Sequence, residues 1–319
     1  MNIMIFFFYG PNTYMLRKKL RQMTTTYIEK SGSDFGLERI DGAAVTAEKL
    51  RANLQASPFL ANSRLVIIEN LGKNKAVNAK IEQIVSDVPS TTVAVFVETE
   101  PDARTTYYKE MLKLAQPAFF EALPQPKLMS WTKSEIERFG GTAERDAITM
   151  LLDMTNGDQW RLSEEIQKVV NYDANVTPMT VTLLVEAGLD QNVFDLVDAM
   201  TGGRDSDALR VYQKLLAARE DEFKILGMIE WQLRNLLLAK AAGQMPSAEL
   251  AKVAGMSPYA AGKMQTASRR YDIEILKSAY KNAVDTEDAM KKGITPSVVA
   301  VEQLIFKVAS LTKPQTRSI

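Results

Sequence analysis

The chain has 319 residues, 46% of them apolar and 24% charged, which is typical of a globular protein with two or three domains. The charges of its 39 basic and 39 acidic residues cancel to a net charge of zero. Proteins that bind nucleic acid without partners usually carry a clear basic excess. Cysteine and histidine are both absent, which excludes disulfides, a cysteine nucleophile, a Ser–His–Asp triad and a Cys/His zinc site.

The apolar run Ile3–Phe8 opens the chain. It is far shorter than a membrane span, and neither a basic segment nor a cleavage site flanks it. We therefore expect this run to form a buried strand rather than a leader. We also expect a cytoplasmic protein without contact to a membrane, and the lack of cysteine fits such a reducing compartment.

Short apolar runs alternate with helical patterns through about residue 123. The expected strands are rich in β-branched and aromatic residues: Ile3–Phe8, Phe35–Ile40, Leu65–Glu69, Val93–Glu98 and Ala118–Ala122. The expected helices lie between them: Tyr14–Lys30, Ala47–Gln55, Asn74–Ser86 and Thr105–Ala115. This alternation predicts an α/β domain over residues 1–125, with a parallel sheet and right-handed crossovers.

Pro124 and Pro126 predict an extended linker, and no convincing strand follows them. A small helical domain is expected over residues 126–189, with these helices: Ser130–Arg138, Ala143–Thr155, Asp158–Asn171 and about 177–187. A larger helical domain is expected over residues 190–319, where one apolar stripe has helical spacing: Leu226, Ile229, Leu233, Leu236 and Leu237. The predicted fold class is therefore α/β followed by all-α.

The first expected strand ends at Gly10, which invites comparison with a phosphate-binding P-loop. Such a loop needs a second glycine, a lysine and a hydroxyl, but Met15, Leu16 and Arg17 stand at those positions. Glu69 ends a strand where a magnesium-binding acid would sit, and without the lysine and hydroxyl it is better interpreted as an ordinary strand-end carboxylate. We expect no nucleotide-binding residues, no catalytic residues, no metal and no cofactor.

Two basic clusters each allow two interpretations, phosphate or nucleic-acid binding and a solvated helix face. The first follows the degenerate loop: Arg17, Lys18, Lys19 and Arg21. The second lies with Tyr259, Tyr271 and Tyr280 in the C-terminal part: Lys263, Arg269, Arg270, Lys277 and Lys281. The structural interpretation is favoured for both.

The segment Ser57-Pro58-Phe59-Leu60 connects a helix to a buried strand. Pro58 cannot continue the helix, so two large apolar residues fall in a short connection at the rim of the sheet. Connections usually run over the surface. Phe59 and Leu60 are therefore either buried in their own domain or offered to a pocket of a partner, and position alone leaves both options open.

Several stretches together resemble the delta subunit of the bacterial DNA polymerase III clamp loader. They are FFFYGPNTYMLRKKL, LQASPFLANSRLVIIEN, VETEPDARTTYYKEMLKLA, NGDQWRLSEEIQKV, NVFDLVDAMTGGRDSDALRVYQKLL and EDEFKILGMIEWQLRNLLLAK. The resemblance covers nearly the whole chain. It implies a degenerate AAA+ module, made of the α/β domain and a helical lid, followed by a helical collar that holds the subunits of the loader together.

The resemblance also implies a function, which is to bind and open the ring-shaped sliding clamp (beta) during DNA replication. Phe59 and Leu60 would enter a hydrophobic pocket of the clamp, with Ser57 and Pro58 beside them. This sequence departs from the common pattern of the family in that Phe precedes Leu and a proline precedes both. The other implied partners are the gamma/tau and delta-prime subunits, and primer-template DNA within the complex. The chain itself would be a non-catalytic accessory subunit of the polymerase.

Three other functions remain as alternatives. An active AAA+ nucleotide-binding protein conflicts with the missing Gly-Lys-Ser/Thr residues of the loop. A delta-prime-like scaffold subunit usually carries a cysteine zinc cluster and a Ser-Arg-Cys motif, which a chain without cysteine lacks. A DNA-binding scaffold that acts alone conflicts with the zero net charge.

Overall fold

The computed structural model describes residues 4–58 and 62–312, which fall into two compact units divided between Ala122 and Leu123. A parallel sheet makes up the core of the first unit, and the second is mainly helical, so the fold class predicted from the sequence is confirmed. The further division of the second unit at residue 190 stays a prediction.

The first unit is built on a five-stranded sheet with the order β2-β3-β4-β1-β5, in which all neighbouring strands are parallel. The strands are β1 (Ile5–Tyr9), β2 (Leu37–Asp41), β3 (Arg64–Glu69), β4 (Thr92–Glu98) and β5 (Gln116–Phe119). Phe96 of β4 pairs with Ile68 on one side and Phe7 on the other, and all three are fully buried. Burial on both faces explains why β3 and β4 are almost continuously apolar.

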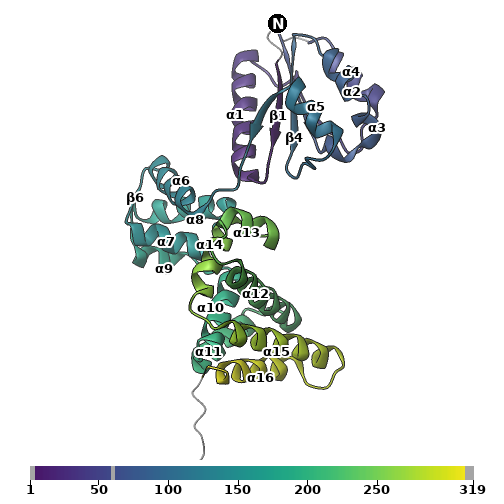
Figure 1. Cartoon of the computed structure of the whole chain (residues 1–319). Coiled ribbons are helices and arrows are strands. Elements are labelled where there is room, and N and C mark those ends of the chain that lie inside the picture. Colours follow the sequence, from purple (N-terminus) through teal and green to yellow (C-terminus); the bar gives the residue numbers. More distant parts are fainter. Residues whose placement is uncertain (1–3, 59–61, 313–319) are drawn as a thin grey trace, which may run out of the picture. The chain divides into compact units, whose positions relative to one another are not determined.

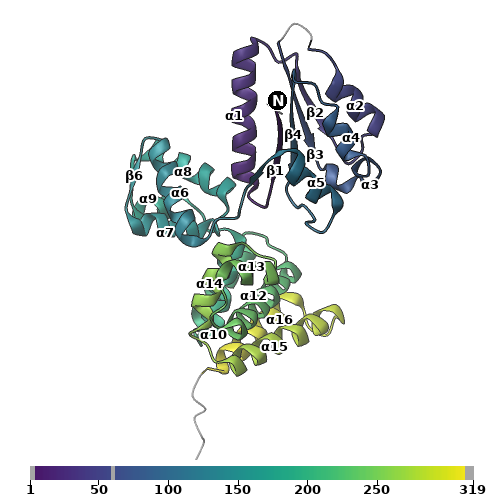
Figure 2. The same ribbon diagram turned by 45° about the horizontal axis from the view of Figure 1, so that its top comes forward.

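The helices of the first unit are divided unevenly between the two faces of the sheet. From β1 the chain crosses to β2 at one edge of the sheet, and from there each later strand is added towards the other edge. Because crossovers are right-handed, the β1–β2 connection lies on one face of the sheet and every later connection lies on the other. Helix α1 (Thr13–Ser31) therefore stands alone on its face, as Figures 1 and 2 show. The opposite face carries α2 (Ala47–Gln55), α3 (Lys75–Asn78), α4 (Ile81–Ser86) and α5 (Thr106–Leu114).

Some boundaries in the first unit differ from those expected. The stretch predicted as one helix, Asn74–Ser86, forms α3 and α4, and a 3-10 turn, Leu71–Lys73, precedes them. Strand β5 begins earlier than expected, at Gln116, and tolerates Pro117 because it is an edge strand.

The second unit begins with four helices around one apolar core, α6 (Gln125–Arg138), α7 (Arg145–Met154), α8 (Gln159–Tyr172) and α9 (Pro178–Leu184). The predicted linker at Pro124 is shorter than expected, because Pro126 lies in the first turn of α6, where its missing N–H has no helical partner to lose. The expectation of no strand was wrong. Thr142–Ala143 (β6) and Asn175–Val176 (β7) form a two-stranded parallel sheet. Two-residue strands are too short to leave a periodic pattern in the sequence.

The rest of the second unit packs around a larger core. Its helices are α10 (Leu189–Thr201), α11 (Asp205–Ala217), α12 (Glu222–Ala242), α13 (Ser247–Ala254), α14 (Pro258–Ser268), α15 (Ile273–Lys291) and α16 (Ser297–Ser310). The predicted stripe lies on α12, where Leu226, Ile229, Leu233 and Leu236 are buried. Within the described ranges, no helix combines the length and apolar character that a membrane span requires.

Candidate functional site

The segment predicted to bind a partner lies in the connection from α2 to β3. The helix ends at Gln55, and Ala56 already has an extended backbone. Ser57 is exposed and Pro58 is half-buried. Phe59 and Leu60 lie outside the described residues, so the position of their side chains stays a prediction.

Arg64, the first residue of β3, anchors this connection at its base. Its guanidinium donates hydrogen bonds to the carbonyl of Asn53 and, at 3.4 Å, to that of Ala56, both at the C-terminal end of α2. The same group forms an ion pair of 2.5 Å with Glu38 of β2, and only 12% of the Arg64 side chain is exposed. One arginine thus satisfies carbonyls that have no partner within the helix and ties them to the sheet.

Two further hydrogen bonds fix the ends of the connection. The hydroxyl of Tyr27 on α1 donates to the carbonyl of Ser63 at 2.9 Å, just before β3 begins. The buried hydroxyl of Thr92 on β4 donates to the carbonyl of Leu54 at 3.0 Å, in the last turn of α2. No local sequence pattern predicts these roles of Arg64, Tyr27 and Thr92, since their acceptors lie 8 to 38 positions away along the chain. Ser57 and Pro58 therefore extend from a base held on both sides.

The loop after β1 lies at the end of the sheet opposite to the α2–β3 connection. Its backbone N–H groups form hydrogen bonds within the domain. The Gly10 N–H donates to the carbonyl of Glu98 at 3.0 Å, and the Asn12 N–H donates to that of Phe120 at 3.1 Å. Pro11, between them, has no N–H. Gly10 itself has φ +125°, and a Cβ there would lie 2.4 Å from the Phe120 carbonyl oxygen. A phosphate cradle needs several N–H groups aimed at the ligand, and these residues offer none.

Arg17, at the position where a P-loop has its hydroxyl, pairs with Glu69. The two side chains form a bidentate ion pair with both N–O distances at 2.6 Å. The hydrogen bonds from Arg17 lower the pKa of the Glu69 carboxyl against the opposing effect of its partial burial, and Arg39 adds to the lowering. The expectation of an ordinary strand-end carboxylate misses this pairing. Among the described residues, no group of three or more acids forms a candidate metal site.

Glu98, at the end of β4, is a buried carboxylate that the sequence reasoning did not single out. It accepts hydrogen bonds from the Gly72 N–H at 2.6 Å and from the Tyr107 hydroxyl at 3.2 Å. Burial raises the pKa of Glu98, and the hydrogen bonds partly offset that rise. These contacts connect the 3-10 turn and α5 to the end of the strand, which is a structural role.

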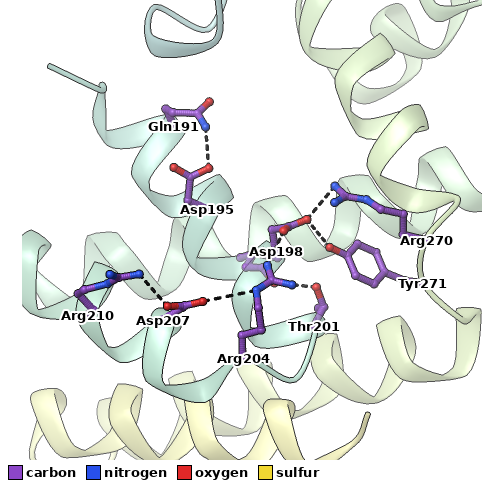
Figure 3. Close-up of polar contacts among 10 residues, drawn as sticks. Gln191, Asp195, Asp198, Thr201, Arg204, Asp207, Arg210, Arg270 and Tyr271 are labelled. Atoms are coloured by element: carbon purple, nitrogen blue, oxygen red, sulfur yellow. Dashed lines mark hydrogen bonds and ion pairs between the residues drawn. The ribbon is translucent and has the colours of Figure 1, made fainter. Parts of the chain in front are cut away.

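The basic and aromatic residues of the C-terminal part are largely engaged inside the second unit. Figure 3 shows Asp198 of α10 as the acceptor for three side chains. They are Arg204 at 2.7 Å, Arg270 at 2.8 Å and the hydroxyl of Tyr271, whose burial, with this hydrogen bond, raises its pKa to about 12. The contacts hold α10 to the α10–α11 connection and to the α14–α15 connection.

A second acid, Asp153 of α7, plays the same role towards α14. It accepts a hydrogen bond from the Tyr259 hydroxyl at 2.9 Å and forms an ion pair with Lys263 at 3.0 Å. Lys277 pairs with Glu274 within α15. For Lys263, Arg270 and the two tyrosines, these contacts support the structural interpretation over one in which the same side chains bind nucleic acid.

The Arg17–Glu69 pair can be tested by a double-mutant cycle of Arg17→Met and Glu69→Gln. We expect a coupling energy of about 1 kcal/mol at pH 7, the upper range for a partly exposed bidentate pair. The pKa of Glu69 is lower in the folded state, so this stabilisation is present above the unfolded-state pKa of about 4.3 and is lost as pH falls below it. Hydrogen exchange of the β1 and β4 amides measures it. A coupling that persists at pH 2.5 would contradict the ionic origin.

The Asp198 network predicts that Asp198→Ala lowers the free energy of unfolding of the second unit by about 2–3 kcal/mol, because two guanidiniums and a buried phenol lose their acceptor. Asp207→Ala is the matched control. It removes a half-exposed acid of the neighbouring helix, so we expect less than about 1 kcal/mol. Urea denaturation followed by tryptophan fluorescence reports on this unit alone, since Trp131, Trp160 and Trp231 all lie in it. Equal losses for both variants would contradict the network.

The architecture is that of an α/β domain that has kept a P-loop topology without its phosphate chemistry, joined to a helical second unit. Residues 6–119 match the family described as DNA polymerase III, delta subunit, and residues 190–308 match its C-terminal domain. DNA polymerase III subunit delta of Bacillus subtilis (strain 168) is 26% identical over 252 residues, which are 74% of this chain and 72% of that protein.

A solved structure shows the same fold. The DNA clamp loader delta protein of Bacillus subtilis superposes with a TM-score of 0.74 at 22% identity, over 96% of this chain and 95% of that one. The chain belongs to the DNA polymerase III delta-subunit family. The family resemblance found in the sequence is thereby confirmed, and with it the assignment to an accessory subunit of the replicative polymerase.

Proposed function

We propose that this chain binds the sliding clamp through Ser57, Pro58, Phe59 and Leu60 and opens the ring. The observation that carries the proposal is the construction of the α2–β3 connection. Arg64, Tyr27 and Thr92 fix both of its ends, while Ser57 between them is exposed. A short, anchored connection loses little conformational entropy when its tip docks, which favours tight binding through few side chains.

Phe59 and Leu60 act in this proposal as the anchors of the interface. Large apolar side chains that fill a pocket at the centre of an interface contribute most of the binding energy, and neighbouring contacts mainly exclude water. Opening then follows from differential affinity: the subunit holds one clamp interface in the open arrangement because it binds that arrangement more tightly than the closed one.

The subunit itself consumes no ATP in this mechanism and catalyses no reaction. The internally bonded N–H groups of Gly10 and Asn12 and the Arg17–Glu69 pair support this, since both occupy groups that a nucleotide and its magnesium would need. Neighbouring gamma/tau subunits would supply the ATP-driven motion, and delta-prime would complete the ring of subunits on primer-template DNA. The place of action is the cytoplasm.

The helical part of the chain has two roles in the proposal. Residues 126–189 form the lid of the degenerate AAA+ module, and residues 190–319 form the collar that joins the other loader subunits. Two apolar cores in these stretches support the division, although Tyr259 of the later stretch packs into the core of the earlier one.

The first prediction of this proposal concerns the anchors. Phe59→Ala combined with Leu60→Ala is expected to weaken binding of the cognate clamp by about 3–4 kcal/mol, as for central anchors of an interface. Surface plasmon resonance with immobilised clamp measures the loss. Phe35→Ala is the control, because Phe35 is 73% exposed in the same unit but outside the connection, and it should bind like wild type. Equal binding by the double variant would remove the site assignment.

The second prediction concerns the base of the connection. Arg64→Met keeps the length of the side chain but removes its hydrogen bonds to Asn53, Ala56 and Glu38. We expect clamp affinity to fall by about 1 kcal/mol, because the connection then loses conformational entropy on docking.

Arg51→Met is the matched control for Arg64→Met. Arg51 lies on α2 and makes a longer ion pair of 3.6 Å with Asp87. It should bind the clamp like wild type, as measured by the same method. Loss of affinity in both variants to the same extent would show that helix α2, rather than the anchored connection, determines binding.

A further inference from the structure

The lone helix on one face of the sheet leaves that face partly uncovered. Parallel sheets are normally covered by helices on both faces, and α1 is the only one that the β1–β2 crossover supplies among the described elements. The hydrogen bond from Tyr27 to Ser63 and the Arg17–Glu69 pair tie α1 to the two ends of β3, and its buried Leu16 and Leu20 share a core with β1, β3 and β4. Beside it, Met4 is exposed and Val93 is half-buried.

A groove of about 900 Å³ lies between one flank of α1 and the strand ends on this side. Met23 and Tyr27 of α1 and the strand residues Leu65 and Val93 contribute its apolar surface. The α1 residues that line it run from Lys19 to Ser31, which is more than three turns of the helix. The groove can therefore receive an extended stretch of partner surface rather than a single side chain.

The rim of the groove is basic. Lys19 and Lys30 are both exposed and lie on the same flank of α1, eleven positions and so about 16 Å apart. None of the described residues that line the groove carries a carboxylate. Charge complementarity therefore selects a partner surface that is apolar at its centre and acidic at both ends.

The groove is continuous with the proposed clamp-binding segment. Asn62 and Ser63, which follow that segment directly, lie on the rim of the groove. Tyr27 links the two features, since its ring lines the groove and its hydroxyl holds the Ser63 carbonyl. A partner that engages residues 57–60 would lie beside the opening of the groove.

We propose that the groove along α1 is a second contact surface for the sliding clamp, which receives an acidic segment with apolar side chains next to the pocket that takes Phe59 and Leu60. This inference rests on the proposed function, because the clamp is its occupant. The lysines steer the approach of the clamp and fix its orientation, while the segment at 57–60 supplies most of the affinity.

The charge of the rim is tested with Lys19→Glu combined with Lys30→Glu in the full chain. We expect clamp affinity to fall about tenfold, mainly through a slower association rate, with a weaker dependence of that rate on salt. Arg21→Glu combined with Lys109→Glu is the charge-matched control, since both residues are exposed and outside the groove, Arg21 on the far side of α1 and Lys109 on α5. It should change the affinity less than about twofold.

The space in the groove is tested with a second pair of variants. Thr26 is exposed and lines the groove, so Thr26→Trp should obstruct it and weaken clamp binding about tenfold. Thr25, also exposed, does not line the groove, and Thr25→Trp should bind like wild type. Both side chains are exposed, so neither substitution disturbs the core, and circular dichroism verifies that each variant is folded.

The outcomes separate the two proposals. Loss of binding in the Lys19/Lys30 and Thr26 variants but not in their controls supports the groove as a clamp surface. If these variants bind like their controls while Phe59→Ala with Leu60→Ala loses binding, the groove inference is wrong and the proposed function stands. If no variant, including that double alanine variant, differs from wild type, the proposed function fails together with the inference.

Discussion

The five-stranded parallel sheet is the constraint on which the other features of the first unit depend. Parallel pairing puts the starts of all strands at one edge and their ends at the other. The degenerate loop after β1, Glu69 and Glu98 therefore gather at one edge, and the connection into β3 lies at the opposite edge. The part of the domain that a nucleotide would occupy and the part proposed to bind the clamp are separated by the length of the strands.

Anchoring by long side chains gives this arrangement its rigidity. Arg64 holds the end of α2 to β2 and β3, and Tyr27 holds the start of β3 to α1. The proposed clamp-binding segment thus extends from a framework of two helices and three strands. Such anchoring suits the proposed role, because a segment held at both ends loses little conformational entropy when it docks.

The sequence predicted much of this fold and less of the site. Continuous apolar runs such as Leu65–Glu69 identified the buried strands, and the stripe on α12 identified a core helix. The β6–β7 pair escaped because two residues carry no periodicity. Arg17 and Glu69 are 52 positions apart in the sequence, and the carbonyl acceptors of Arg64 precede it by 8 and 11 positions. No local pattern in the sequence therefore predicts either contact. Position in the chain identified the segment at 57–60, but its chemistry depends on Phe59 and Leu60, outside the described residues.

The pairing of Arg17 with Glu69 makes the loss of nucleotide chemistry hard to reverse in evolution. Replacing Arg17 by a hydroxyl residue would remove the bidentate partner of Glu69 and leave it the longer ion pair of 3.7 Å with Arg39. Replacing Leu16 by the lysine of a P-loop would put a charge into the apolar core beneath α1, where Leu16 is fully buried. A functional P-loop on this sequence would therefore need several simultaneous substitutions, each of which is destabilising alone.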